Sequence, residues 1–203
     1  MNSIQPILKG RQHLDEKYIK VNGKDCYDLN CIDNKTKFVT AHLFVDKRSY
    51  SNCVKFLSQI KELCYGQILG RYYTRKYFDK DYPLIKFVCD GFANYLKALM
   101  KLFYRVAEIQ SGVPIACKKY GRKYNNNAIE RYNGKLKDRM NARRGNFKSF
   151  EYAESFMNLQ RIINNFVNPH QQIGEKTPAE KAEIKLRLGR NKLLELIRYV
   201  AKA

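Results

Sequence analysis

The chain has 203 residues and a formal net charge of +20, from 39 lysines and arginines against 19 acidic residues. Hydrophobic residues make up 44% of it, which excludes wholesale disorder and leaves room for a sizeable core. So large a positive excess would repel itself in a compact fold, and it therefore indicates a polyanionic partner, most simply a nucleic acid.

The first elements along the chain form an antiparallel meander. Residues 12–21 alternate in polarity like a half-buried strand, and Asn22-Gly23 is a strong hairpin signal. A second strand is predicted near 25–32 and a third over 36–45. These three strands open the predicted sheet.

The pattern then changes to that of helices alternating with short strands. A helix is predicted over 50–64, a buried strand over 84–89, a helix over 92–104 and a strand near 106–110. Strand, helix and strand in this order imply parallel pairing through a right-handed crossover.

A basic, tyrosine-rich stretch, 70–78, precedes the fourth strand. Its rings could stack on nucleic-acid bases, or they could cover the core beneath a connection.

The C-terminal half is predicted to be helical. Residues 118–127 have no apolar periodicity and are typical of a basic loop, and a helix follows from about Asn127. Further helices are predicted over 149–167, from the cap at Thr177 to Gly189, and over 192–201.

Together these elements predict an α/β fold: a mixed five-stranded sheet, three antiparallel strands then two parallel, flanked by helices and followed by a helical tail. The predicted divisions are an N-terminal stub (1–11), a core (12–168) and the tail (169–203).

Three carboxylates stand in distinctive settings. Asp15 lies in the middle of the first strand, Asp90 follows the buried strand 84–89, and Glu130 lies on the helix after the basic loop. If the first strand is central, Asp15 and Asp90 meet at one edge, where Glu130 can join them. Oxygen ligands of this kind suit Mg²⁺ or Mn²⁺, and two such ions can catalyse phosphoryl transfer.

Each acid also has a plainer interpretation. Asp90 before Gly91 can be a turn residue, Asp15 beside Glu16 can be one of two charges on an edge strand, and Glu130 can form an exposed ion pair. It is their occurrence together, in this order, that favours a catalytic set.

The positive charge is concentrated around Glu130. Residues 118–148 hold eleven basic residues and only two acids, Glu130 and Asp138. Lys137 lies two helical turns beyond Glu130 on the same face, where it could contact a phosphate or simply face solvent. The predicted DNA contacts are Asn127, Arg131, Lys135, Lys137, Arg143 and Arg144.

The ordered motifs resemble a known family. The order Asp15, Asp90-Gly91, Asn127-x-x-Glu130 and Lys137 is similar to the catalytic core of insertion-sequence transposases of the DDE class, which are related to retroviral integrases. The stretches 144–150, 165–170 and 176–180 match further motifs of that family, so the resemblance covers about residues 11–185.

This resemblance implies a ribonuclease-H-like fold and metal-dependent DNA cleavage and strand transfer. Water and then a 3′-hydroxyl would attack phosphodiesters without a covalent enzyme intermediate. Asp15, Asp90 and Glu130 would be the catalytic metal ligands for Mg²⁺ or Mn²⁺, two ions in all, and Lys137 would contact DNA. The implied partners are the transposon ends, the target duplex and a second copy of the chain, as a homodimer.

The chain departs from the family pattern in three places. The interval 91–129 is longer than usual, and His13 stands where the family commonly has an aromatic residue. Only residues 1–14 precede Asp15, so we expect no helix-turn-helix before the core and DNA binding without sequence preference.

Two other functions stay open at this point. One is a DNA-binding remnant that has lost catalysis, which the intact set of acids disfavours. The other is a nuclease of the ribonuclease-H type, which would require a fourth acid that the sequence does not place.

The remaining features bear on location. None of the six cysteines forms a Cys-x-x-Cys pair and the three histidines lie far apart, which disfavours structural zinc and suggests small core residues. No apolar run approaches the roughly 20 residues of a membrane span, and the N-terminus is not typical of a signal peptide. We therefore expect an intracellular protein with reduced thiols, in the cytoplasm or nucleoid of a prokaryote, without a membrane partner.

Overall fold

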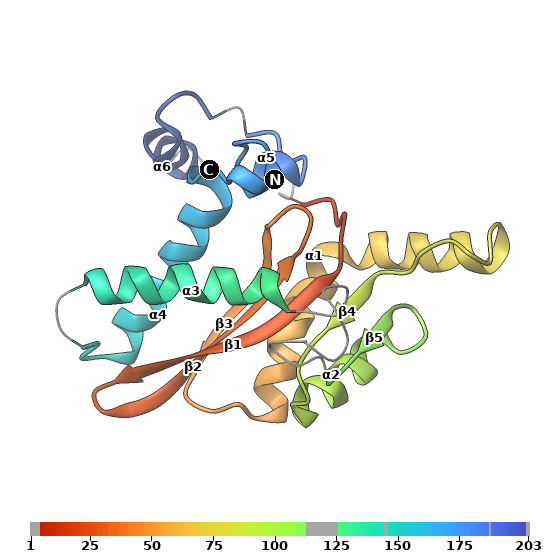
Figure 1. Ribbon diagram of the computed structural model, residues 1–203, viewed down its shortest axis with the longest axis horizontal. Coiled ribbons are helices and arrows are strands. Elements are labelled where there is room, and N and C mark those ends of the chain that lie inside the picture. Colours follow the sequence, from red (N-terminus) through yellow and green to blue (C-terminus); the bar gives the residue numbers. More distant parts are fainter. Residues whose placement is uncertain (1–4, 113–125, 144–145, 187, 202–203) are drawn as a thin grey trace.

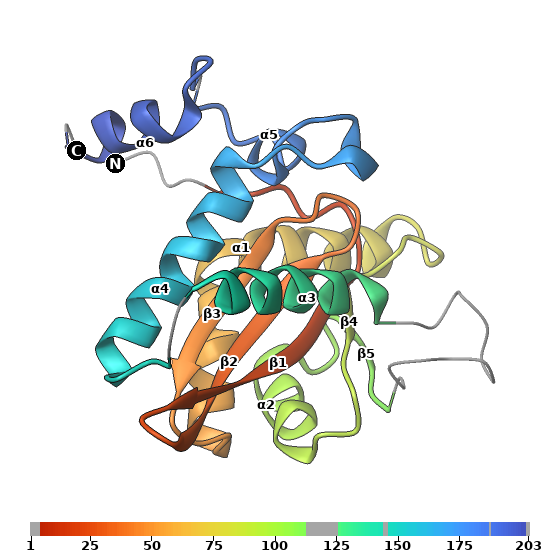
Figure 2. The same ribbon diagram turned by 60° about the vertical axis from the view of Figure 1, so that its left-hand side comes forward.

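The computed structural model describes residues 5–112, 126–143, 146–186 and 188–201. It contains a five-stranded mixed sheet with helices on both faces (Figure 1 and Figure 2). The strand order is β3-β2-β1-β4-β5, and β1 is therefore central. The strands are β1 (Gln12–Val21), β2 (Lys24–Asp33), β3 (Val39–Val45), β4 (Lys86–Val88) and β5 (Glu108–Gln110).

The pairing follows the prediction of three antiparallel strands and then two parallel ones. β1 pairs antiparallel with β2 and parallel with β4, and β4 pairs parallel with β5. Asn22 and Gly23 both have positive φ (48° and 77°), which suits a tight hairpin and sets Val21 opposite Lys24. From this turn the register continues to Asp15, which lies opposite Asn30.

Each face of the sheet has its own helices and its own apolar core. On one face lie α1 (Tyr50–Tyr77) and α2 (Ala93–Phe103). On the other lie α3 (Asn127–Ala142) and α4 (Phe150–Ile162), which a π-helical turn (Ile163–Val167) extends. Fully buried side chains of the first core include Leu14, Leu29, Phe56, Phe87, Tyr95 and Leu99. The second core includes Ile19, Ile32, Phe44, Ile129 and Met157.

Helix α1 is longer than the helix predicted over 50–64. It begins after the cap residue Ser49, whose side chain accepts a hydrogen bond from Asn52 N at 3.2 Å, and it continues through the stretch 70–77. The prediction ended too early because Ile68, one turn beyond Cys64, is the last buried residue of α1. The residues after it are mostly basic residues and tyrosines, so no apolar periodicity marks the rest of the helix. The exposed fractions of Tyr73 and Tyr77 are 48% and 64%, so these two rings do not cover the core as a connection would.

The helix predicted from Thr177 to Gly189 is much shorter in the structure. The capping box of Thr177 and Glu180 is present, but α5 covers only Pro178–Lys181. Glu183 has a positive φ of 65°, and Ile184 N donates to Ala179 O at 2.9 Å, as in a Schellman motif. This turn brings Ile184 into a small cluster with Phe38 and Phe166, and burial of that cluster explains the early end.

The other boundaries differ by a few residues. β3 begins at Val39 and not at 36, because residues 33–37 form a turn in which Lys37 has a positive φ of 62°. β4 and β5 are shorter than predicted. A 3-10 turn (Gln171–Ile173) precedes α5, and α6 (Lys192–Ala201) matches the last predicted helix. The loop predicted over 118–127 lies mostly outside the described residues.

Two further predictions concern cysteines and membranes. Cys26, Cys31, Cys53, Cys64 and Cys89 are free and buried, as expected for small core residues, whereas Cys117 lies outside the described residues. Within the described ranges, no helix combines the length and apolar character needed to cross a membrane.

Candidate metal centre

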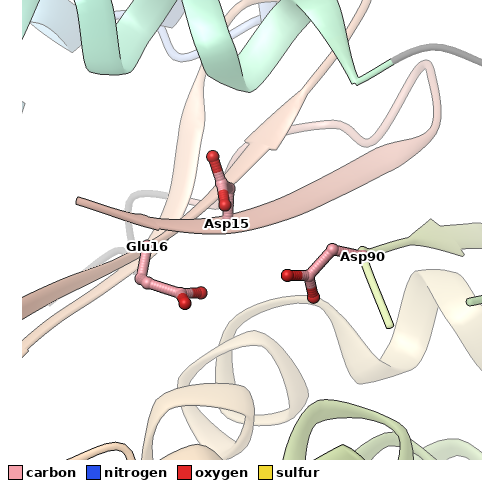
Figure 3. A group of neighbouring side chains, drawn as sticks. All are labelled: Asp15, Glu16 and Asp90. Carbon is pink, nitrogen blue, oxygen red and sulfur yellow. The ribbon is translucent and has the colours of Figure 1, made fainter. Parts of the chain in front are cut away.

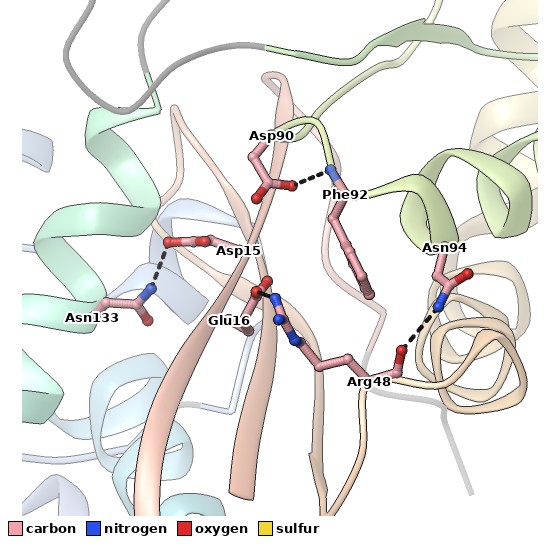
Figure 4. A network of polar contacts seen from close by, with 7 residues as sticks. All are labelled: Asp15, Glu16, Arg48, Asp90, Phe92, Asn94 and Asn133. Carbon is pink, nitrogen blue, oxygen red and sulfur yellow. Dashed lines mark hydrogen bonds and ion pairs between the residues drawn. The ribbon is translucent and has the colours of Figure 1, made fainter. Parts of the chain in front are cut away.

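Asp15 is presented to α3 by the alternation of the central strand. Odd-numbered residues of β1 face α3, and there Asn133 Nδ2 donates a hydrogen bond to Asp15 Oδ2 at 2.9 Å (Figure 4). Burial raises the pKa of Asp15 to about 7, and the neighbouring carboxylates of Glu16 and Asp90 add to the rise. Because β1 is central, Asp15 and Glu16 are not charges on an edge strand, and that plainer interpretation was wrong.

Asp90 reaches the same place from the parallel strand β4. His13 pairs with Val88, so Asp15 and Asp90 are two residues further along adjacent parallel strands. The Asp90 carboxylate is oriented by Phe92 N, which donates to Oδ1 at 3.0 Å, and the Asp90 carbonyl accepts from Gly112 N at 3.1 Å. This residue is thus both a turn residue and a neighbour of Asp15.

Glu16 is the residue that the sequence did not single out. One carboxylate oxygen from each of Asp15, Glu16 and Asp90 lies within 4.8 Å of the others (Figure 3). Glu16 points to the opposite side of β1 from Asp15, and only 5% of its side chain is exposed. We call these three residues the acidic cluster.

Arg48 fixes one oxygen of Glu16. Its guanidinium donates to Glu16 Oε1 and lies over the ring of Phe92, 4.7 Å from the centroid (Figure 4). It also lies over the rings of Tyr18 and Tyr27. Burial raises the pKa of Glu16 even though Arg48 opposes that rise. Glu16 Oε2 is buried and has no partner of normal hydrogen-bond geometry among the described residues, although the Tyr95 hydroxyl lies close enough to lower the pKa of Glu16. This oxygen is therefore a candidate ligand atom for a cation.

Glu130, the predicted third ligand, does not belong to the acidic cluster. It lies in the first turn of α3, on the helix face that carries Asn126 and Asn133. Asn126 Nδ2 donates to Leu14 O at 3.2 Å and Asn133 contacts Asp15, so this face of α3 is turned toward β1 on both sides of Glu130. Its Oε1 atom is buried without a partner in the described part of the chain, and burial raises its pKa.

The predicted DNA contacts divide into three groups. Asn127, Arg131 and Lys135 line a cleft of about 910 Å³ beside the start of α3. Lys137 is exposed on α3, and the Arg143 guanidinium stacks on Phe147, 3.7 Å from the ring centroid. Arg144 lies outside the described residues.

The fold is that of retroviral integrase catalytic cores. A chain in a simian T-cell lymphotropic virus intasome in complex with the PP2A regulatory subunit B56 gamma superposes with a TM-score of 0.57 and 12% identity, over 94% of this chain. This chain spans 59% of the length of that one. The HTLV-2 integrase catalytic core domain in complex with magnesium matches with a TM-score of 0.51 in its dimeric form, at 12% identity, over 87% of this chain and 97% of that one.

A trimeric form of the same HTLV-2 domain gives a TM-score of 0.53 at 11% identity, over 88% of this chain and 99% of that one. These likenesses confirm the predicted ribonuclease-H-like, integrase-like architecture. No protein-family model and no curated protein matches the sequence.

The residues present fit a divalent cation. Mg²⁺ and Mn²⁺ take oxygen ligands at about 2.1 Å, so two oxygens on one octahedral ion lie roughly 3–4 Å apart. The three carboxylate oxygens of the acidic cluster lie within 4.8 Å of one another, which is near this spacing. Three carboxylates from β1 and the end of β4 therefore surround one place in the fold, and Glu130 lies on the face of α3 that is turned toward β1.

Proposed function

We propose that this chain is the catalytic core of a DDE-class transposase, which cleaves DNA and transfers the cleaved end to a target duplex. The observation that carries the proposal is the approach of Asp15 and Asp90, from adjacent parallel strands, in an integrase-like fold. The net charge of +20 supports a polyanionic substrate.

In this proposal Asp15 and Asp90 are metal ligands held by rigid strands, and Glu130 is a third ligand supplied by α3. Asn133 orients the Asp15 carboxylate, and Phe92 N orients that of Asp90. Bound Mg²⁺ or Mn²⁺ would supply the charge that activates an attacking oxygen and stabilises the leaving one. The predicted homodimer, the two ions and a nucleoid location are parts of the same proposal.

The first test measures metal binding directly. Calorimetry with Mn²⁺ should show binding by the wild type, and Asp90→Asn should weaken it at least tenfold while the circular dichroism spectrum is kept. Asp138→Asn is the matched control, because Asp138 is an exposed acid on α3 and should leave binding unchanged. Equal Mn²⁺ binding by the wild type and Asp90→Asn would remove the basis of the proposal.

The second test concerns the reaction. With Mn²⁺ and a duplex that ends in a free 3′-hydroxyl, the wild type should nick and join DNA, and Asp15→Asn should not. DNA binding without either product in the wild type would instead support the catalytically inactive remnant.

A second candidate function is hydrolysis by a nuclease of the ribonuclease-H type. Glu16 favours it, since it is the fourth acid that such an enzyme requires. Cleavage of RNA–DNA hybrids without joining of DNA 3′-ends would select this function over strand transfer, and Glu16→Gln should then impair cleavage.

A further inference from the structure

A strongly basic cleft lies at the opposite end of β4 from Asp90. It has a volume of about 910 Å³ and is bordered by the start of β1, the β2–β3 turn, the C-terminal half of α1 and the start of α3. Nine lysines and arginines line it against two acids, Asp81 and Glu108, as counted over the described residues. Six of these cations carry the argument: Lys35, Lys37, Arg71, Arg75, Arg131 and Lys135. We call this feature the basic cleft.

The basic cleft is rigidly built around one buried carboxylate. Asp33, which is 1% exposed, accepts hydrogen bonds at Oδ2 from the backbone N–H groups of Lys9 and Gly10, both at 2.9 Å. At Oδ1 it accepts from Lys35 N at 2.8 Å and Thr36 N at 2.9 Å. Asp33 therefore uses its oxygens to hold two backbone segments whose side chains enter the cleft.

The basic cleft holds too few acidic side chains to neutralise its lysines and arginines. Glu108 pairs with Arg75 at 3.1 Å and with Lys86 at 2.9 Å, and no ion pair involves Arg131 or Lys135 within the described ranges. Burial, the neighbouring Arg131 and Lys135 lower the pKa of Lys37, with Asp33 opposing. Cations crowded in this way are stabilised by an anion that spans several of them.

The position of the basic cleft relates it to the acidic cluster. Lys86, at the start of β4, lines the cleft, and Asp90 lies four residues further along the chain, two residues beyond the end of β4. At a rise of about 3.3 Å per residue this separation is roughly 13 Å, which is about four base-pair steps of 3.4 Å along the axis of a DNA duplex. One duplex can therefore occupy both places.

We propose that the basic cleft binds the sugar-phosphate backbone of duplex DNA, several nucleotides away from the phosphodiester at the acidic cluster. The inference rests on the proposed function and names where its DNA substrate lies. Contacts to phosphates carry no sequence information, so the cleft fixes the position of the duplex without selecting its sequence.

The test compares two triple variants with the same change in charge. Lys35, Arg131 and Lys135 are changed to alanine in the cleft variant, because they are exposed and their loss should not disturb the fold. The control variant changes three lysines that are exposed and do not line the cleft: Lys20, Lys55 and Lys97. Binding of a fluorescent duplex is followed by anisotropy in EDTA, which excludes any metal-dependent step.

Each phosphate contact contributes about 0.9 to the slope of log K against log salt concentration, which is about eightfold in affinity at 0.1 M salt. The cleft variant should thus lose on the order of 100- to 1,000-fold in affinity and about 2.7 in slope. The control variant should lose less than tenfold. Equal losses in the two variants would overturn the proposal, because affinity would then follow net charge alone.

A substitution that should strengthen DNA binding tests whether the losses in the cleft variant come from misfolding. Glu108→Gln removes the acid that occupies Arg75 and Lys86, so it should tighten DNA binding severalfold and steepen the salt dependence. Unchanged or weaker binding would contradict the proposal. Wild-type binding that depends on the cleft, together with absent nicking and joining, would refute the proposed function and leave this inference standing.

Discussion

Replacing Asp15 by asparagine should stabilise the metal-free protein, although it should destroy metal binding. Asp15 shares a small volume with the carboxylates of Glu16 and Asp90, and burial raises its pKa from 3.8 to about 7. A folded chain that holds this proton more tightly than the unfolded chain loses stability as the pH rises from about 4 to about 7. At pH 8 the ionised carboxylate therefore opposes folding.

The size of the effect follows from the pKa. A rise of about 3 units at roughly 1.4 kcal/mol per unit sets an upper bound of about 4 kcal/mol. An asparagine can still accept the hydrogen bond from Asn133 but must bury an amide, so we expect a gain of about 2–3 kcal/mol at pH 8. For a chain of this length that is roughly 5–10 °C in melting temperature.

Thermal denaturation in EDTA at pH 8 and pH 4.5 measures this prediction. The stabilisation of Asp15→Asn should be present at pH 8 and largely absent at pH 4.5, and the exposed Asp25→Asn should change neither. Added Mn²⁺ should reverse the order at pH 8, because a ligand stabilises only the protein that binds it. An Asp15→Asn protein that melts no higher than the wild type at pH 8 would refute this reasoning.

Two other substitutions test how the fold holds its functional parts. In Gly10→Ala the new Cβ would lie 2.1 Å from Asn34 Oδ1 at the edge of the basic cleft. This substitution should therefore destabilise the chain by about 1–3 kcal/mol in urea unfolding and should also weaken DNA binding. Unfolding at the wild-type urea concentration would show that the turn adapts without cost. Thr177→Ala should cost about 1 kcal/mol by removing the capping box before α5, and an unchanged unfolding midpoint would show that packing alone holds that turn.

The central part of the candidate site could be predicted because local patterns determine it. The alternation of 12–21 and the apolar run before Asp90 define two strands, and a parallel register then brings Asp15 and Asp90 together. Glu130 could be placed on a helix, but its distance from the strands depends on packing that periodicity does not report.

Glu16 was missed for a different physical reason. Alternation places it on the opposite face of β1 from Asp15, which argues against a shared site. The structure brings its carboxylate close because the side chain turns toward Asp90, in contact with Arg48 from the segment before α1. Neither the turn of this side chain nor that long-range contact leaves a signal near Glu16 in the sequence.

The basic cleft could not be predicted for the same reason: its residues come from segments that are far apart in the sequence. The charge of 118–148 is visible in the sequence, but only Arg131 and Lys135 from that stretch line the cleft with a basic side chain in the described structure. Its other cations come from the segment before β1, the β2–β3 turn, α1 and the start of β4, and Asp33 holds the first two of these segments together.

The lysines and arginines of the basic cleft lie apart from the carboxylates of the acidic cluster, and this separation favours both proposed binding sites. A lysine or arginine beside Asp15 or Asp90 would neutralise the carboxylates and compete with a metal ion for them. Arg48 is the cation that pairs with the acidic cluster in the described part of the chain, and it binds Glu16, the member that the DDE pattern does not require. The positive charge that a phosphate backbone needs is gathered instead at the far end of β4. Under the two proposals, this arrangement would let the fold bind DNA strongly and still keep Asp15 and Asp90 for metal.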